Sequence, residues 1–166
     1  RQVGEARYRM VFEELLTLQT GLLYIKQGRS KADKGICIEK DISVRDFTDS
    51  LPFSLTSGQL HVWKDIENDL ASCKAMNRLV QGDVGSGKTA VAELSMYKTV
   101  KGGFQAAMMA PTELLAKQHY ASLCRDFEPF GIKVDLLCSS MKAKEKKLAL
   151  NRLISGETDI IVGTHA

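Results

Sequence analysis

The sequence predicts an α/β protein with a parallel sheet flanked by helices. Short apolar runs at 105–110, 132–138 and 158–163 alternate with segments of helical periodicity at 112–127 and 141–154. Strands separated by helices of this length are typical of β-α-β units, whose strands run parallel. Another apolar run, 78–81, leads into a glycine-rich turn and a helical segment that starts near Lys88. We therefore expect four strands in one sheet, in a chain about one domain long.

The glycine-rich turn matches the phosphate-binding P-loop signature. Residues 82–89 fit G-x-x-x-x-G-K-[ST] between strand and helix patterns. Glycine permits positive φ and a close approach of backbone N–H groups to phosphate, and a helix N-terminus favours an anion. The residues that we expect around the phosphates are Gly82, Gly85, Ser86 and Gly87. Lys88 and Thr89 are the catalytic candidates, Lys88 for the β- and γ-phosphates and Thr89 for Mg²⁺. The alternative is a turn that matches by accident.

The stretch 51–59 comes before the P-loop. Thr56 or Ser57 can cap a helix that continues through Trp63, which we expect in the core rather than as a stacking platform. The amide of Gln59, in the first turn, is suited to reading the edge of an adenine. The alternative is an ordinary capped helix with an exposed glutamine. Gln59 and Phe53 are therefore counted among the nucleotide-binding candidates, and ATP is the expected nucleotide.

Composition restricts the classes of protein less than the motifs do. The 166 residues include 23 lysines and arginines against 20 aspartates and glutamates, a net charge of +3, which does not by itself identify a nucleic-acid binder. No apolar run is long enough for a membrane span, and no signal-peptide pattern is present. Both ends look cut, so we treat the sequence as a fragment of a longer chain.

The cysteines and histidines show no metal-binding spacing. We expect reduced thiols of a cytosolic protein, and no metal site other than that for Mg²⁺. The residues concerned are Cys37, Cys73, Cys124, Cys138, His61, His119 and His165.

Residues 5–26 predict one long amphipathic helix, with Gly21 as its weak point. Its apolar stripe is expected to pack on the domain behind it; the alternative is a strut to a further N-terminal domain. Residues 27–42 lack periodicity and predict a linker or a loose surface connection.

In a parallel sheet, ligands bind beyond the carboxyl ends of the strands. Those ends carry Pro111-Thr112, Ser139-Ser140 and Gly163-Thr164-His165, which can contact phosphates through N–H and O–H groups. Taken singly these are ordinary turn and cap residues, but together they indicate a second phosphate track beside the nucleotide. The lysines that follow are expected on a solvated helix face, with nucleic-acid contact as the alternative. They are Lys142, Lys144, Lys146 and Lys147.

Four stretches, 51–59, 78–89, 109–119 and 159–166, resemble the RecG family of superfamily 2 DNA helicases. The resemblance implies a first RecA-like motor lobe at 51–166, and at 1–50 a linker helix and connection from a DNA-splitting wedge domain. It implies that Gln59 reads adenine. It implies DNA contacts at Pro111, Thr112, Glu113, Ser139, Ser140, Gly163, Thr164 and His165. The family often has Gly-Ser where Ser139-Ser140 stand.

By this resemblance the parent chain is an ATP-driven DNA helicase or translocase that remodels branched or forked DNA. We expect a monomer in the bacterial cytoplasm, associated with the nucleoid, without a membrane partner. The alternatives are a translocase that couples transcription to repair, a small-molecule P-loop kinase, and a nucleotide-dependent switch without motor activity. The coupling family typically has tyrosine in place of Ser86 and Val-Pro-Thr-Thr in place of residues 110–113.

Hydrolysis in this superfamily needs a carboxylate pair at the end of a later strand. Asp159 begins its strand, at the end of the sheet far from the P-loop, and Asp83 lies within the loop and is expected to be structural. We therefore expect this chain alone to bind ATP with Mg²⁺ weakly and not to hydrolyse it.

Overall fold

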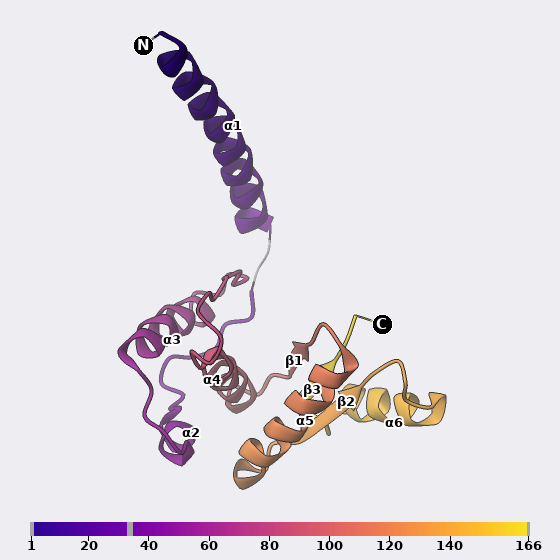
Figure 1. Ribbon diagram of the computed structural model, residues 1–166. Coiled ribbons are helices and arrows are strands. Elements are labelled where there is room, and N and C mark those ends of the chain that lie inside the picture. Colours follow the sequence, from indigo (N-terminus) through magenta and orange to yellow (C-terminus); the bar gives the residue numbers. More distant parts are fainter. Residues whose placement is uncertain (1, 33–34, 166) are drawn as a thin grey trace.

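The computed structural model describes residues 2–32 and 35–165 (Figure 1). The helices are α1 (Gln2–Ala32), α2 (Arg45–Ser50), α3 (Ser57–Leu70), α4 (Lys88–Lys101), α5 (Glu113–Phe127) and α6 (Ala143–Ile154), with a 3₁₀ turn η1 (Glu128–Phe130). The strands are β1 (Ala106–Met109), β2 (Val134–Leu137) and β3 (Ile160–Gly163). No helix in these two ranges is long and apolar enough to cross a bilayer.

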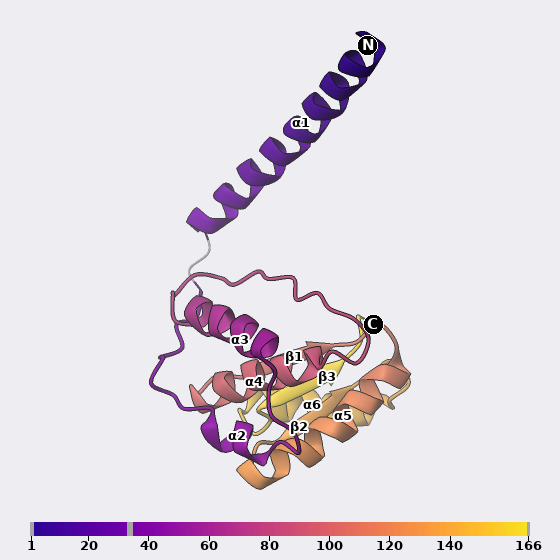
Figure 2. The same ribbon diagram turned by 60° about the vertical axis from the view of Figure 1, so that its left-hand side comes forward.

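The three strands form a parallel sheet in the order β1-β3-β2. Ile160 pairs with Ala106 on one side and Val134 on the other, and Gly163 pairs with Met109 and Leu137. The connection through α5 crosses from β1 to β2, and the connection through α6 returns to β3. Right-handed crossovers in opposite directions place the two helices on opposite faces of the sheet, and Figure 2 shows α5 in front of the strands and α6 behind them. The predicted parallel α/β fold is confirmed.

The run before the P-loop is not a strand, contrary to our prediction. Residues 75–83 have no helix or strand conformation, and Leu79 is 88% exposed. A strand is stable only where a neighbour takes up its backbone N–H and C=O groups. None of the three described strands pairs with residues 78–81, so this run has no inter-strand hydrogen bonds to hold it extended.

The core is centred on α2, an element that our sequence prediction missed. Phe47 is fully buried and its ring stacks on Tyr97 of α4 and Phe127 of α5, each at 5.2 Å between centroids. Phe130 closes the cluster from η1. Trp63 of α3 is buried in the same core, as predicted. The cluster fixes α4, which carries the P-loop, against the end of α5.

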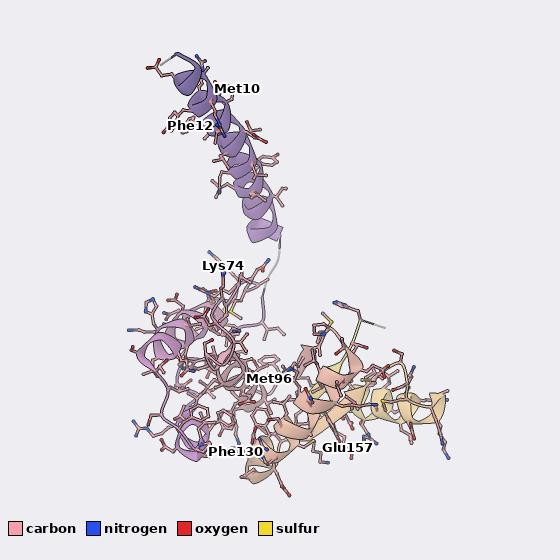
Figure 3. The ribbon with its side chains drawn as sticks, in the orientation of Figure 1. Met10, Phe12, Lys74, Met96, Phe130 and Glu157 are labelled. Atoms are coloured by element: carbon pink, nitrogen blue, oxygen red, sulfur yellow. A yellow bond between two sulfur atoms is a disulfide. The ribbon has the colours of Figure 1, made fainter. Side chains whose placement is uncertain are left out.

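Helix α1 is longer than predicted and does not pack on the lobe. It continues through residues 27–32, which we had assigned to a linker; residues 33–34 lie outside the described residues. All side chains from 4 to 25 are exposed, and α1 extends away from the sheet (Figure 1). Met10 and Phe12 are 72% and 54% exposed and project into open space (Figure 3). Its apolar stripe therefore finds no partner in the described structure.

The connection after α1 is held to the loop that follows α3. The Ile38 N–H donates to the Leu70 carbonyl at 3.0 Å, and Cys37 forms a disulfide with Cys73. The expectation of four reduced thiols is therefore wrong for this pair, because the fold brings together two residues 36 positions apart. Cys124 and Cys138 are free thiols.

Candidate functional site

The P-loop forms a turn that opens α4 at Lys88, as predicted. Gly85 and Gly87 have φ values of 80° and 75°, in the left-handed region that favours glycine. A Cβ on Gly82 would lie 2.8 Å from the Ser86 hydroxyl oxygen. Gly85 and Gly87 are therefore favoured by their positive φ, whereas at Gly82 a side chain would require the Ser86 hydroxyl to move.

The ammonium group of Lys88 lies inside this turn. Its Nζ donates to the carbonyl oxygens of Gly82 at 2.8 Å and Asp83 at 2.7 Å, and more weakly to the Ser86 hydroxyl at 3.4 Å. The first N–H groups of a helix lack intrahelical acceptors, so a cation and backbone donors meet at one point. This donor set fits an anionic group such as a phosphate, which would take the place of the two carbonyls. Thr89 follows on the exposed first turn of α4.

Gln59 is not free, contrary to our expectation. Its Oε1 accepts from the Thr56 N–H at 2.8 Å, and its own N–H donates to the Thr56 hydroxyl, which completes a capping box at the start of α3. Its Nε2 donates to the Ser86 carbonyl at 3.0 Å. Both ends of the amide are therefore engaged, and Gln59 links the cap of α3 to the P-loop.

Phe53 lies in the segment that joins α2 to α3 and is 49% exposed. It lines a hollow of about 490 Å³ together with Asp49, Leu51 and Pro52. The contact between this region and the P-loop is made by Gln59, not by Phe53.

The P-loop shares an edge of the sheet with the strand ends. Only residues 102–105 separate α4 from β1, so their junction lies at the amino end of β1. The opposite end of α4, with the P-loop, therefore faces the carboxyl edge, where ligands of parallel sheets bind. Asp159 precedes β3 at the amino edge, where its carboxylate accepts from the Lys133 N–H at 2.7 Å. The prediction that Asp159 lies at the end of the sheet far from the P-loop is confirmed.

Beyond β1, Pro111 and Thr112 lead into α5. The Thr112 side chain caps that helix by accepting from the Leu115 N–H at 3.3 Å. The carboxylate of Glu113 does not point to open solvent. It accepts from the Ser139 hydroxyl and from the Ser140 N–H, both at 2.8 Å. Hydrogen bonds from Ser140 and then Ser139 lower the pKa of Glu113 to about 2.

Between these loops, β3 ends at Gly163. A Cβ there would lie 2.5 Å from the Leu137 carbonyl oxygen, so only glycine fits between the neighbouring strands. The hydroxyl of Thr164 is buried and has no hydrogen-bond partner in the described structure, and His165 is exposed. The three predicted strand-end segments thus share one edge. Lys142, Lys144 and Lys147 are exposed and Lys146 is half-buried beside it.

Two buried charged residues of α4 escaped our sequence analysis. Lys98 is fully buried and donates to Glu67 and to the carbonyls of Lys40 and Ile42. Glu93 is 6% exposed, and its burial, followed by the nearby Asp126 charge, raises its pKa to about 7. Helical spacing could have revealed the burial of Lys98, because Lys98 falls four residues after the buried Leu94, on the apolar face of α4.

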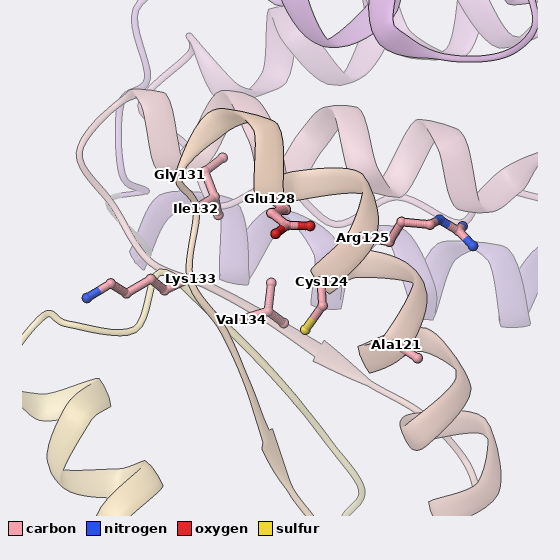
Figure 4. Close-up of a pocket in the computed structure, with 8 residues that line it drawn as sticks. All are labelled: Ala121, Cys124, Arg125, Glu128, Gly131, Ile132, Lys133 and Val134. Atoms are coloured by element: carbon pink, nitrogen blue, oxygen red, sulfur yellow. The ribbon is translucent and has the colours of Figure 1, made fainter.

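A hollow of about 690 Å³ lies away from this edge, at the amino end of β2 (Figure 4). Cys124 and Glu128 line it, as do two basic side chains. Arg125 pairs with Asp126 and Lys133 pairs with Glu157, so the cations are already neutralised. Among the described residues, no cluster of histidine, cysteine or carboxylate side chains could hold a metal ion.

A P-loop that opens a helix at the carboxyl edge of a parallel sheet defines a P-loop NTPase lobe. The family described as DEAD/DEAH box helicase matches residues 56–166, and the chain belongs to this family. Over nearly its whole length the chain is similar to ATP-dependent DNA helicase RecG. It is 46% identical to the protein of Bacillus subtilis over 162 residues, which are 97% of this chain and 24% of that protein. It is 42% identical to the Thermotoga maritima protein over 165 residues, which are 98% of this chain and 21% of that protein.

Solved structures agree with this assignment. A structure described as RecG bound to a three-way DNA junction matches with a TM-score of 0.88 at 41% identity, covering 98% of this chain and 22% of that one. A hypothetical ATP-dependent RNA helicase from Sulfolobus tokodaii shares the fold, with a TM-score of 0.54 at 20% identity over 72% of this chain and 32% of that one. The resemblance to RecG is thereby confirmed. The chain spans less than a quarter of the length of the RecG proteins from Bacillus subtilis and Thermotoga maritima.

Proposed function

We propose that this chain is part of the first motor lobe of an ATP-dependent DNA helicase that remodels branched DNA, such as stalled forks, in recombination and repair. The observation that carries the proposal is the shared edge of the sheet, where the P-loop meets three polar strand-end loops. Similarity to RecG over 97% and 98% of the chain supports it, and so does the likeness to RecG bound to a three-way junction.

Lys88 is the residue that we assign to the β- and γ-phosphates of ATP. Its ammonium group now contacts two backbone carbonyls, neutral acceptors that a phosphate would outcompete because a charged acceptor makes a stronger hydrogen bond. The N–H groups of Gly82, Gly85, Ser86 and Gly87 are assigned to the same phosphates, and that of Ser86 would first have to release the Asp83 carbonyl. When bound, Mg²⁺ neutralises phosphate charge, and the Thr89 hydroxyl is the ligand that we assign to it.

Gln59 and Phe53 are assigned to the adenine side of the site. Reading an adenine edge requires the Gln59 amide to release the Ser86 carbonyl or the Thr56 N–H, both of which it now contacts. Base recognition and the shape of the P-loop would therefore be linked through this side chain.

The polar strand-end loops are assigned to one DNA backbone. Their small and hydroxyl residues offer N–H and O–H donors without steric bulk, which suits phosphate oxygens. The hydroxyl of Thr164 is buried and unpaired in the described structure, so it would donate to a phosphate only if the end of β3 shifted to expose it. The residues are Pro111, Thr112, Ser139, Ser140, Gly163, Thr164 and His165, with Glu113 treated below.

We assign residues 51–166 to the motor lobe and residues 1–50 to the connection from a DNA-splitting wedge domain. The exposed apolar stripe of α1 supports this division, because a stripe without a partner in the lobe is available to another domain. In this proposal the protein acts as a monomer in the bacterial cytoplasm at the nucleoid. Closure of two lobes on ATP and their reopening after hydrolysis would step the motor along DNA.

ATP hydrolysis by the intact parent protein tests the proposal. We expect stimulation by forked DNA over single strands and linear duplex, and loss of this stimulation in Lys88→Ala. Lys64→Ala, on the exposed face of α3, is the matched control and should behave as wild type. The present chain alone should show no hydrolysis. Equal rates with and without DNA would refute the motor and favour a nucleotide-dependent switch.

A further inference from the structure

A single carboxylate joins two of the loops at the carboxyl edge. Glu113 is the first residue of α5, just after β1, whereas Ser139 and Ser140 follow β2. Glu113 Oε1 accepts from the Ser139 hydroxyl and the Ser140 N–H, each at 2.8 Å, across 26 and 27 positions of sequence. Since β3 lies between β1 and β2, the contact spans the edge at which β3 ends.

Cys138 and Met141 anchor the two ends of the loop that Glu113 holds by packing in the core, but the loop has few other polar contacts. The Cys138 N–H donates to the Met141 sulfur at 3.3 Å, and sulfur is a weak acceptor. The Met141 N–H donates to the Cys138 carbonyl at 3.2 Å. Both of these bonds lie within the loop, so neither one positions it against β1 and α5. The hydrogen bonds to Glu113 tie the loop to the start of α5.

The charge of Glu113 is unexpected at an edge that faces phosphates. A carboxylate and a phosphate repel each other, and lysines at positions 117, 142 and 146 otherwise make this region basic. The residue as a whole is half-buried, and one carboxylate oxygen accepts from both serines. Its hydrogen bonds keep it ionised at every pH at which the protein would work.

We propose that Glu113 is a positioning residue for DNA binding. It fixes the Ser139-Ser140 loop so that the donors of this loop and of Gly163-Thr164 meet successive phosphates, and it does not itself contact DNA. The inference rests on the proposed function, because it presumes that this edge binds a DNA backbone. It changes the role of Glu113 from the direct contact that we expected to an indirect one.

Three substitutions separate positioning from direct electrostatic effects. Glu113→Gln keeps an acceptor oxygen and removes the charge, Glu113→Ala removes both, and Ser139→Ala removes one of the donors. Glu128→Ala, an exposed glutamate at the far end of α5, is the matched control. Each change is made in the intact parent protein. Binding of a fluorescent forked DNA is then measured by anisotropy over a range of salt concentrations.

We expect Glu113→Ala to weaken binding about tenfold and to lower the slope of log K against log salt by about one phosphate contact. Glu113→Gln should stay within about threefold of wild type, and Glu128→Ala should be unchanged. The double variant Glu113→Ala/Ser139→Ala should bind no worse than Glu113→Ala, because both changes break the same contact. The DNA concentration for half-maximal ATPase should rise in Glu113→Ala while the maximal rate stays constant.

Hydrogen exchange of residues 138–142 in the DNA-free protein tests the brace separately. We expect faster exchange in Glu113→Ala, little change in Glu113→Gln, and an intermediate rate in Ser139→Ala. Ser139→Ala is the milder change, and it keeps the test available if Glu113→Ala fails to fold. Unchanged exchange in Glu113→Ala and Ser139→Ala would overturn the inference. Tighter binding by both Glu113 variants would also overturn it, since the carboxylate would then merely repel DNA.

The two proposals fail differently. If wild-type protein binds forked DNA and Glu113→Ala binds equally well, the positioning role is refuted and the helicase function stands. If wild-type protein does not bind forked DNA, the proposed function is refuted, and the positioning role is refuted with it.

Discussion

The buried ammonium group of Lys98 offers a sharp test of how this lobe is held together. Lys98 lies on α4 with no exposed surface, and its Nζ donates to Glu67 Oε1 at 2.7 Å and to the Lys40 and Ile42 carbonyls at 3.2 Å. It therefore ties the connection before α2 and one end of α3 to the P-loop helix. Lys98→Met keeps the volume of the stem and removes all three bonds.

The size of the effect follows from the three bonds that are lost. A hydrogen bond to a neutral carbonyl contributes about 1 kcal/mol, and one between charged groups about 1.5–3 kcal/mol. Glu67 is 29% exposed and can turn toward water, which favours the lower value. Relief of the buried charge offsets a further part. We expect a net loss of about 2 kcal/mol in the free energy of unfolding.

Urea unfolding of the 166-residue chain measures this loss. Trp63, the single tryptophan, is buried in the same core and reports unfolding by fluorescence, with circular dichroism as the second probe. With a slope of about 2 kcal/mol per molar urea, the midpoint should fall by about 1 M. Lys64→Met on the exposed face of α3 is the control and should change stability by no more than about 0.5 kcal/mol. If Lys98→Met also changes the free energy of unfolding by no more than about 0.5 kcal/mol, the cost of burying the charge cancels the three hydrogen bonds, and the prediction is refuted.

Two further predictions concern pH and redox state. Since burial raises the pKa of Glu93 to about 7 from 4.5, the folded state binds its proton more tightly, and stability should fall as pH rises from about 4.5 to 7. Glu93→Gln should remove this dependence of stability on pH and stabilise the chain at pH 8 by on the order of 2 kcal/mol. Urea unfolding at pH 5 and pH 8 measures both effects. If the stability of variant and wild type changes with pH in parallel, the prediction is wrong. The bond between Cys37 and Cys73 closes a loop of 36 positions, so its reduction should cost about 4 kcal/mol and lower Tm. Cys73→Ser should be insensitive to reductant, and Cys124→Ser should be as sensitive as wild type. Identical Tm values for oxidised and reduced wild-type chain would refute that stabilising role.

The elements of the β-α-β units were predictable because their signals are local. Helix α5 begins at Glu113 behind its Thr112 cap, within one residue of the predicted start, and β1, β2 and β3 each fall inside a predicted apolar run. A cap needs only the next three residues, and apolar periodicity needs only one face to be buried. The start of α4 at Lys88 followed for the same reason.

The failures came where the outcome depends on a distant partner. The run at 78–81 has a strand-like composition but pairs with none of the described strands. Helix α2 is six residues long and is stabilised by the stacking of Phe47 on Tyr97 and Phe127. The Gln59 amide was available for a base on sequence grounds, yet the fold brings the Ser86 carbonyl within 3.0 Å of it. No spacing rule reveals such contacts, because they join residues far apart in the chain.

The sequence by itself determined the alternation of strands and helices from β1 to β3, the glycine turn around Lys88 and the polar residues at each strand end, since all of these depend on neighbours within a few positions. Only the tertiary structure decided which donor meets which acceptor. It turned Glu113 from the edge toward Ser139 and Ser140, buried Lys98 among three acceptors, and joined Cys37 to Cys73. The physical reason is that the energies of hydrogen bonds and ion pairs depend on distance in space, which the chain sets only once it has folded.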